Sequence, residues 1–220
     1  MKCNAAIFDM DGLMFDTEEL FLHAFETDIG EELGYRFSRE KMKQLIGLNQ
    51  QAAVEKFPQL FPGCPEEGAV CLKRFRAWMD DYIRKNGVPV KPGLRELLSW
   101  LRAENIPCAL ATSTATDIAR GYLENAGVLD FFAAIIGGDQ VKKSKPDPEI
   151  FTLAMRALGK ESSETCVVFE DSRNGLLAGA NGGFAVIVVP DLFDPTLELP
   201  GLCYAKCARL DEAIDVIRNS

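Results

Sequence analysis

The sequence contains a single histidine, His23, and no apolar run that approaches the length needed to cross a membrane. It also lacks internal repeats and low-complexity stretches, and its first residues lead directly into a short apolar run. We therefore expect a protein without a signal peptide or transmembrane segment, and we place it in the cytoplasm. His23 falls in a helix-patterned segment, where we interpret it as a partly buried surface residue rather than a substrate contact.

The seven cysteines are odd in number and scattered, which fits a reducing compartment. Cys203 and Cys207 are four residues apart, but no second cysteine or histidine pair accompanies them, so we expect no metal site there. Basic residues number 24 against 33 acidic ones, a net charge of −9. This acidic balance argues against nucleic acid or an anionic membrane as the main partner.

Short apolar runs alternate with helical patterns over most of the chain. The runs cover residues 5–8, 107–112, 134–136, 166–169 and 185–189, and clear helical spacing covers residues 93–103 and 148–158. Strands that alternate with helices of this length predict βαβ units, and nearly continuous apolar strands predict a sheet buried on both faces. The expected fold is an α/β, Rossmann-like parallel sheet.

Residues 17–90 break this alternation because they are helix-patterned throughout. We predict a catalytic core formed by residues 1–16 and 91–220, and an inserted all-helical cap formed by residues 17–90. Residues 88–93 would then form the return hinge. Two connections at nearby positions would let the insert move as a lid.

Two carboxylates follow the first apolar run in the segment Asp9-Met10-Asp11-Gly12. Charges at the end of a buried strand are costly unless they are paired, hydrated or bound to a metal. In open α/β sheets the carboxyl ends of the strands are where ligands bind. One carboxylate could act as a nucleophile or metal ligand and the other could move protons, while Gly12 lets the backbone turn away.

The wider stretch from Asp9 to Glu18 resembles the first motif of the haloacid dehalogenase-like hydrolase superfamily. It is most similar to the branch that contains beta-phosphoglucomutases and small phosphatases, and three further motifs follow in order. The resemblance implies a helical cap after the first motif, with Asp9 as a nucleophile that forms an aspartyl-phosphate and Asp11 as general acid and base. It also implies that the dehalogenase branch lacks this second acid.

The second and third motifs carry the candidate phosphate-binding residues. Thr112 and Ser113 follow an apolar strand, where hydroxyl groups and helix-start amides can donate to phosphoryl oxygens. Lys145 precedes a proline and a helix start, and its charge would offset Asp9 and the phosphoryl group. The alternative readings are a hydroxyl-rich helix start without a ligand and a solvated basic loop.

The fourth motif places Glu170 and Asp171 at the end of another apolar strand. Adjacent carboxylates there need a cation, and oxygen-only ligands suit Mg²⁺. We expect Asp9, the Met10 carbonyl and Asp171 as direct ligands. Glu170 would act through water or from behind the direct ligands, and Asp11 belongs to the same metal-binding group. Parallel strands would gather these positions at one edge of the sheet.

The leading hypothesis is a Mg²⁺-dependent phosphomonoester hydrolase that acts on a small phosphorylated metabolite, as a monomer. The alternative is a phosphosugar mutase of the beta-phosphoglucomutase type. Such mutases are implied to carry a cap arginine shortly after a glycine, whereas residues 45–51 of this chain contain none, which favours hydrolysis. A non-catalytic binding protein ranks low because Asp9, Asp11, Lys145 and Asp171 are all present, and a receiver domain would lack the helical insert.

Overall fold

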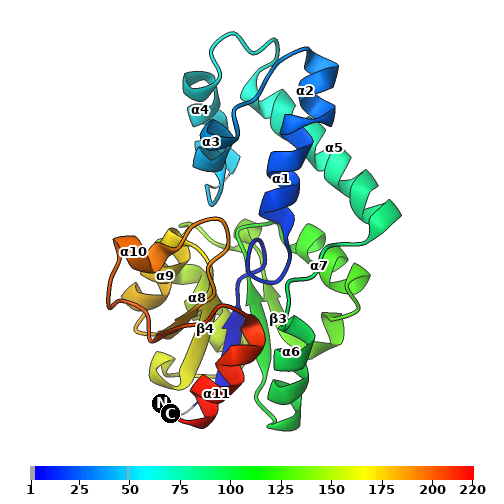
Figure 1. Ribbon diagram of the computed structural model, residues 1–220. Coiled ribbons are helices and arrows are strands. Elements are labelled where there is room, and N and C mark those ends of the chain that lie inside the picture. Colours follow the sequence, from blue (N-terminus) through cyan, green and yellow to red (C-terminus); the bar gives the residue numbers. More distant parts are fainter. Residues whose placement is uncertain (1–2, 49) are drawn as a thin grey trace. The chain divides into compact units, whose positions relative to one another are not determined.

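The structure is a computed structural model that describes residues 3–48 and 50–220 (Figure 1). Met1, Lys2 and Asn49 lie outside the described residues. Asn49 is one of the positions of the 45–51 loop on which the comparison with mutases depends. The chain divides into two compact units, one of Met1–Asp16 with Val88–Ser220 and one of Thr17–Gly87. Among the described residues, no helix combines the length and apolar character that a membrane crossing requires.

Six parallel strands form the sheet of the first unit, in the order β3-β2-β1-β4-β5-β6. They are β1 (Ala5–Phe8), β2 (Cys108–Ala111), β3 (Phe132–Ile136), β4 (Cys166–Glu170), β5 (Ala185–Val188) and β6 (Ala205–Lys206). β1 lies between β2 and β4, and every residue of these three strands is buried. The arrangement confirms the predicted α/β parallel sheet, and it brings the carboxyl ends of β1, β2 and β4 together.

Helices follow the strands of this unit as the alternating pattern predicts. They are α6 (Leu94–Ala103), α7 (Thr116–Asn125), α8 (Glu149–Ala157), α9 (Arg173–Asn181), α10 (Pro195–Glu198) and α11 (Ala213–Arg218). Phe151 of α8 and Leu176 of α9 belong to the same buried cluster as Ile7 of β1 and Val168 of β4. The apolar stripes of α8 and α9 therefore cover one face of the sheet and fix where their amino ends lie.

The described residues of the second unit form helices and the turns between them, with no strand. Its helices are α1 (Thr17–Glu26), α2 (Asp28–Leu33), α3 (Arg39–Met42), α4 (Gln50–Leu60) and α5 (Gly68–Asn86). Aromatic side chains fill its interior: the ring of Phe37 lies 5.0 Å from that of Phe25 and 5.2 Å from that of Phe61. This unit thus has an apolar core of its own, as a separate compact body requires.

The two segments that join the units are paired within the sheet unit. Phe15 and Val90 form an antiparallel bridge, and the amide of Asp16 donates to the carbonyl of Pro89 over 2.9 Å. The amide of Lys91 donates to the carbonyl of Met14, also over 2.9 Å. The outgoing and returning chains therefore lie side by side where they leave the sheet unit.

Candidate active site

The carboxyl ends of β1 and β4 and the loop before α8 bring three charged side chains into direct contact. The ammonium of Lys145 donates to Asp9 Oδ1 over 2.5 Å, to Glu170 Oε1 over 2.6 Å and to the carbonyl of Ala111 over 3.2 Å. All three N–H groups of the ammonium are thus used. Lys145 is 25 residues from Glu170 and 136 residues from Asp9 in the sequence. The three side chains meet because the parallel sheet brings the ends of its strands together.

Both carboxylate oxygens of Glu170 accept hydrogen bonds. Its Oε1 accepts from Lys145, and its Oε2 accepts from the amide and hydroxyl of Ser172 and from the amide of Asp171, over 3.0–3.2 Å. The side chain is fully buried. Its carboxylate also lies against Gly175 in the first turn of α9, where a Cβ would come within 1.8 Å of Glu170 Cδ. Glu170 is thereby fixed in one position.

Asp9, Glu170 and Asp171 each place a carboxylate oxygen within 4.8 Å of the other two. All three residues are buried, with exposed fractions of 8%, 0% and 4%. Lys145 supplies a single positive charge against these three acids. Buried carboxylates at this spacing repel one another unless a cation balances them, and oxygen ligands suit a hard divalent ion. The donor set therefore fits Mg²⁺, with Asp9 and Asp171 better available than the saturated Glu170.

Burial and neighbouring charges shift the pKa values of the nucleophile candidate and its lysine. Burial raises the pKa of Asp9 to about 7; the adjacent Lys145 lowers it and Glu170 raises it. For Lys145, burial lowers the pKa, but Asp9 and Glu170 outweigh this effect and raise it above its usual range. Lys145 is therefore a permanent cation, while Asp9 needs further positive charge to stay ionised at neutral pH.

The side chain of Asp11 contacts the turn that follows β2. Its Oδ2 accepts from the hydroxyl of Thr114 over 2.7 Å and from that of Thr112 over 3.4 Å. The Thr112 hydroxyl also accepts from the amide of Thr114 over 3.1 Å, so this turn is internally braced. Ser113 is exposed between the two threonines. The structure thus links Asp11 with Thr112, and it adds Thr114, which the sequence pattern does not single out.

We expected the Met10 carbonyl to bind the metal, but in the structure this oxygen has other partners. It accepts hydrogen bonds from the amides of Met14 (2.9 Å) and Phe15 (3.1 Å). A carbonyl oxygen has two lone pairs, and both point to amides here. Gly12, with φ of +80°, makes the turn that brings those amides back. Met10 is therefore not part of the ligand set that we propose below.

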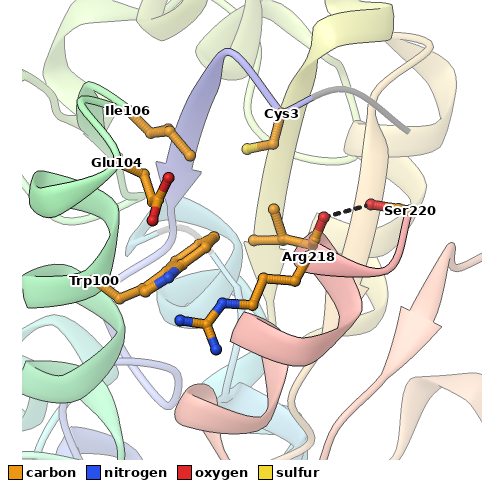
Figure 2. Close-up of a pocket in the computed structure, with 7 residues that line it drawn as sticks. Cys3, Trp100, Glu104, Ile106, Arg218 and Ser220 are labelled. Atoms are coloured by element: carbon orange, nitrogen blue, oxygen red, sulfur yellow. Dashed lines mark hydrogen bonds between the residues drawn. The ribbon is translucent and has the colours of Figure 1, made fainter.

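Two further features are His23, in the helical unit, and a cavity in the sheet unit. His23 of α1 is exposed rather than partly buried as we expected, and its ring lies 6.2 Å from that of Trp78 in the same unit. A cavity of about 630 Å³ is lined by Cys3, Trp100 and Arg218 among others (Figure 2). Because Cys3 precedes β1 whereas Asp9 follows it, this cavity lies at the amino ends of the strands and shares no residue with the acidic cluster.

Comparisons with known proteins place this geometry in a family. The sequence model of the haloacid dehalogenase-like hydrolases matches residues 6–189. A phosphorylated carbohydrates phosphatase of Thermotoga maritima is 32% identical over 182 residues, 81% of each chain. The crystal structure of CbbY from Rhodobacter sphaeroides in complex with phosphate has a TM-score of 0.79 and 26% identity, and the match covers 96% of both chains.

A third relative shows the same fold with a different name. The beta-phosphoglucomutase of Clostridium difficile has a TM-score of 0.77 over 99% of this chain and 97% of its own, at 20% identity. At that identity the likeness concerns the fold alone. The chain therefore resembles a phosphatase in sequence and a mutase in fold, and the fold by itself does not separate the two activities.

Proposed function

Since the chain belongs to the haloacid dehalogenase-like hydrolase family, we propose that it is a Mg²⁺-dependent phosphatase that hydrolyses a phosphomonoester of a small metabolite, a sugar phosphate or nucleoside phosphate. One observation carries the proposal. Lys145 joins Asp9 and Glu170 in a buried acidic cluster, and a second acid, Asp11, is oriented beside it by Thr114. A nucleophile, a fixed cation and a separate proton carrier are the groups that two-step phosphoryl transfer needs.

In the first step an Asp9 oxygen attacks phosphorus, the phosphorus–oxygen bond of the ester breaks, and Asp11 gives its proton to the leaving oxygen. In the second step Asp11 takes a proton from water, the water oxygen attacks the aspartyl-phosphate, and inorganic phosphate leaves Asp9. The splitting of one displacement into two gives each step a positioned nucleophile. The same carboxyl acts first as acid and then as base, so the cycle restores it.

The other residues of the site bind and balance the phosphoryl group in this proposal. Lys145 is held by Asp9 and Glu170, so its charge is fixed beside the attacking oxygen and does not have to reorganise during the reaction. Ser113 lies at the turn after β2 and donates to phosphoryl oxygens, and Thr112 would do the same once its hydroxyl turns away from Asp11. Thr114 acts on Asp11 alone.

Asp9 and Asp171 would hold the Mg²⁺ ion directly, and Glu170 would act from behind them through water. Asp11, which we also expected in the metal-binding group, is not among the three acids whose oxygens lie together, so we assign it to proton transfer alone. The bound ion would balance the three acids and offset the charge of the phosphoryl oxygens. The site therefore provides one positive charge permanently, from Lys145, and obtains the rest from solution. The proposed catalytic core is the sheet unit, and the proposed cap is the helical unit of Thr17–Gly87. This cap ends three residues before the expected residue 90, because residues 88–90 group with the sheet unit.

The mutase alternative requires a second phosphate-binding group. Two arginines of the helical unit are already paired with acids of that unit: Arg39 contacts Glu19 and Glu26, and Arg74 contacts Glu32 and Glu66. Their charges are balanced before any ligand binds. Together with the absence of arginine from residues 45–51, this favours hydrolysis.

The test is phosphate release from a panel of phosphomonoesters with Mg²⁺, in which beta-glucose 1-phosphate is also assayed for isomerisation. We expect free phosphate from one compound class, loss of activity in EDTA and recovery when Mg²⁺ is restored. Glucose 6-phosphate with little free phosphate would instead establish the mutase. Activity that is indifferent to chelation would overturn the proposed metal site.

A further inference from the structure

A fourth acid lies next to the proposed metal ligands. Asp191 follows β5, and one of its carboxylate oxygens lies within 4.8 Å of a carboxylate oxygen of Asp171. Its side chain is only 7% exposed. The parallel sheet explains this position, because β5 is the neighbour of β4 and the loops after both strands leave the sheet at the same edge. Asp191 therefore adds negative charge beside Asp171.

Lys91 contacts this acid from the segment that returns from the helical unit. Its ammonium donates to Asp191 Oδ1 and lies 3.7 Å from Asp16 Oδ1. The backbone of Lys91 is itself fixed, because its amide donates to the carbonyl of Met14. Burial lowers the pKa of Lys91, but the hydrogen bond and charge of Asp191 and the charges of Asp16 and Asp171 outweigh it and raise the pKa. Lys91 thus remains charged.

We propose that the Lys91–Asp191 pair sets the affinity of the neighbouring site for its divalent cation, with Asp191 attracting the ion and Lys91 opposing it. The inference rests on the proposed function, because it assumes that Asp171 is a metal ligand. Neither residue has to touch the ion. Groups behind the direct ligands tune metal affinity through charge and orientation, and their loss typically costs 10- to 100-fold. Asp191 and Lys91 are positioning residues in this scheme.

Removal of the two charges should change the affinity for Mg²⁺ in opposite directions. A purely structural role of the pair predicts no such opposition. Asp191→Asn removes the attracting charge and should weaken Mg²⁺ binding about tenfold. Lys91→Met removes the opposing charge and should tighten binding at least about threefold. The double variant should return close to the wild-type affinity, because both charges are absent.

The experiment is calorimetric titration of Mg²⁺ into the EDTA-treated full-length protein at pH 8, without substrate. Lys206→Met is the matched control, because it removes a lysine of the same unit that pairs with Asp194, over 2.8 Å, and it should leave the affinity unchanged. The shifts above would support the inference. Wild-type affinity in Asp191→Asn, or weaker binding in Lys91→Met, would overturn it. Absence of Mg²⁺ binding by the wild type would instead overturn the proposed function.

Discussion

Gly175 provides a sharp test of how the site is built, because the space for its side chain is occupied by Glu170. A Cβ at this position would lie 1.8 Å from Cδ and 1.9 and 2.1 Å from the two carboxylate oxygens of Glu170. Ordinary contact between carbon atoms needs about 3.5 Å, so in Gly175→Ala the carboxylate must move by about 1.5 Å or more. That displacement exceeds what its bonds to Lys145 and Ser172 tolerate.

The expected effect on stability follows from those lost bonds. Breaking a buried ion pair costs about 3–5 kcal/mol, and alanine regains about 1 kcal/mol over glycine within a helix. Gly175→Ala should therefore lower the free energy of unfolding by about 2–4 kcal/mol. For a chain of 220 residues this corresponds to a Tm lower by about 5–15 °C.

The expected effect on activity follows from Lys145, which loses one of its two acids. We expect kcat/KM to fall about 100-fold, the usual result of a misplacement near 1 Å. Thermal unfolding and phosphate release measure the two effects. Gly121→Ala is the matched control, because Gly121 is an exposed glycine of α7 with nothing within 4 Å of the added Cβ. Wild-type stability and activity in Gly175→Ala would refute the reasoning.

Asp9→Asn should abolish phosphate release and leave the fold intact; residual activity near the wild-type level would remove Asp9 as nucleophile. The pKa of Asp9 in the folded protein is about 7, above its usual 3.8. Below pH 4 Asp9 is protonated in both the folded and the unfolded state, so it does not affect the stability of the metal-free protein. As the pH rises from 4 to 7, the unfolded state loses this proton first, so the free energy of unfolding falls, and it stays lower above pH 7. Chemical unfolding in EDTA should thus show wild-type stability falling relative to Asp9→Asn between these values, and parallel curves would contradict the assignment. Thr114→Val removes the hydroxyl that donates to Asp11 and should lower kcat about tenfold with little change in KM. Thr196→Val removes a comparable bond to Asp194 and should leave both kcat and KM unchanged.

The sequence predicts the strand ends of this protein well because the apolar runs are short and buried on both faces. Asp9 and Asp171 directly follow such runs, so a parallel sheet must place them at one edge. The end of β2 is located in the same way, by Thr112. β6 escapes prediction because Ala205–Lys206 is only two residues long, too short for any periodicity to appear.

The features that escape prediction depend on loop conformation or on distant pairs. Thr114 reaches Asp11 only through the turn after β2, which no periodicity encodes. Lys91 and Asp191 are 100 residues apart. They meet because Asp191 follows β5, while the bond from the Lys91 amide to the Met14 carbonyl holds the returning segment beside it. The two bonds to the Met10 carbonyl arise from the tight turn at Gly12. Local pattern therefore locates strand ends, while tertiary geometry assigns the partners around them.

The helical unit is inserted between two segments, around Phe15 and Val90, that pair with each other. Because the Asp16 amide bonds the Pro89 carbonyl, the residues that flank the insert are already neighbours without it. A two-residue turn could join them at the loop-closure cost of an ordinary hairpin. An insert of different length could therefore start and end at the same paired segments while the sheet stays unchanged.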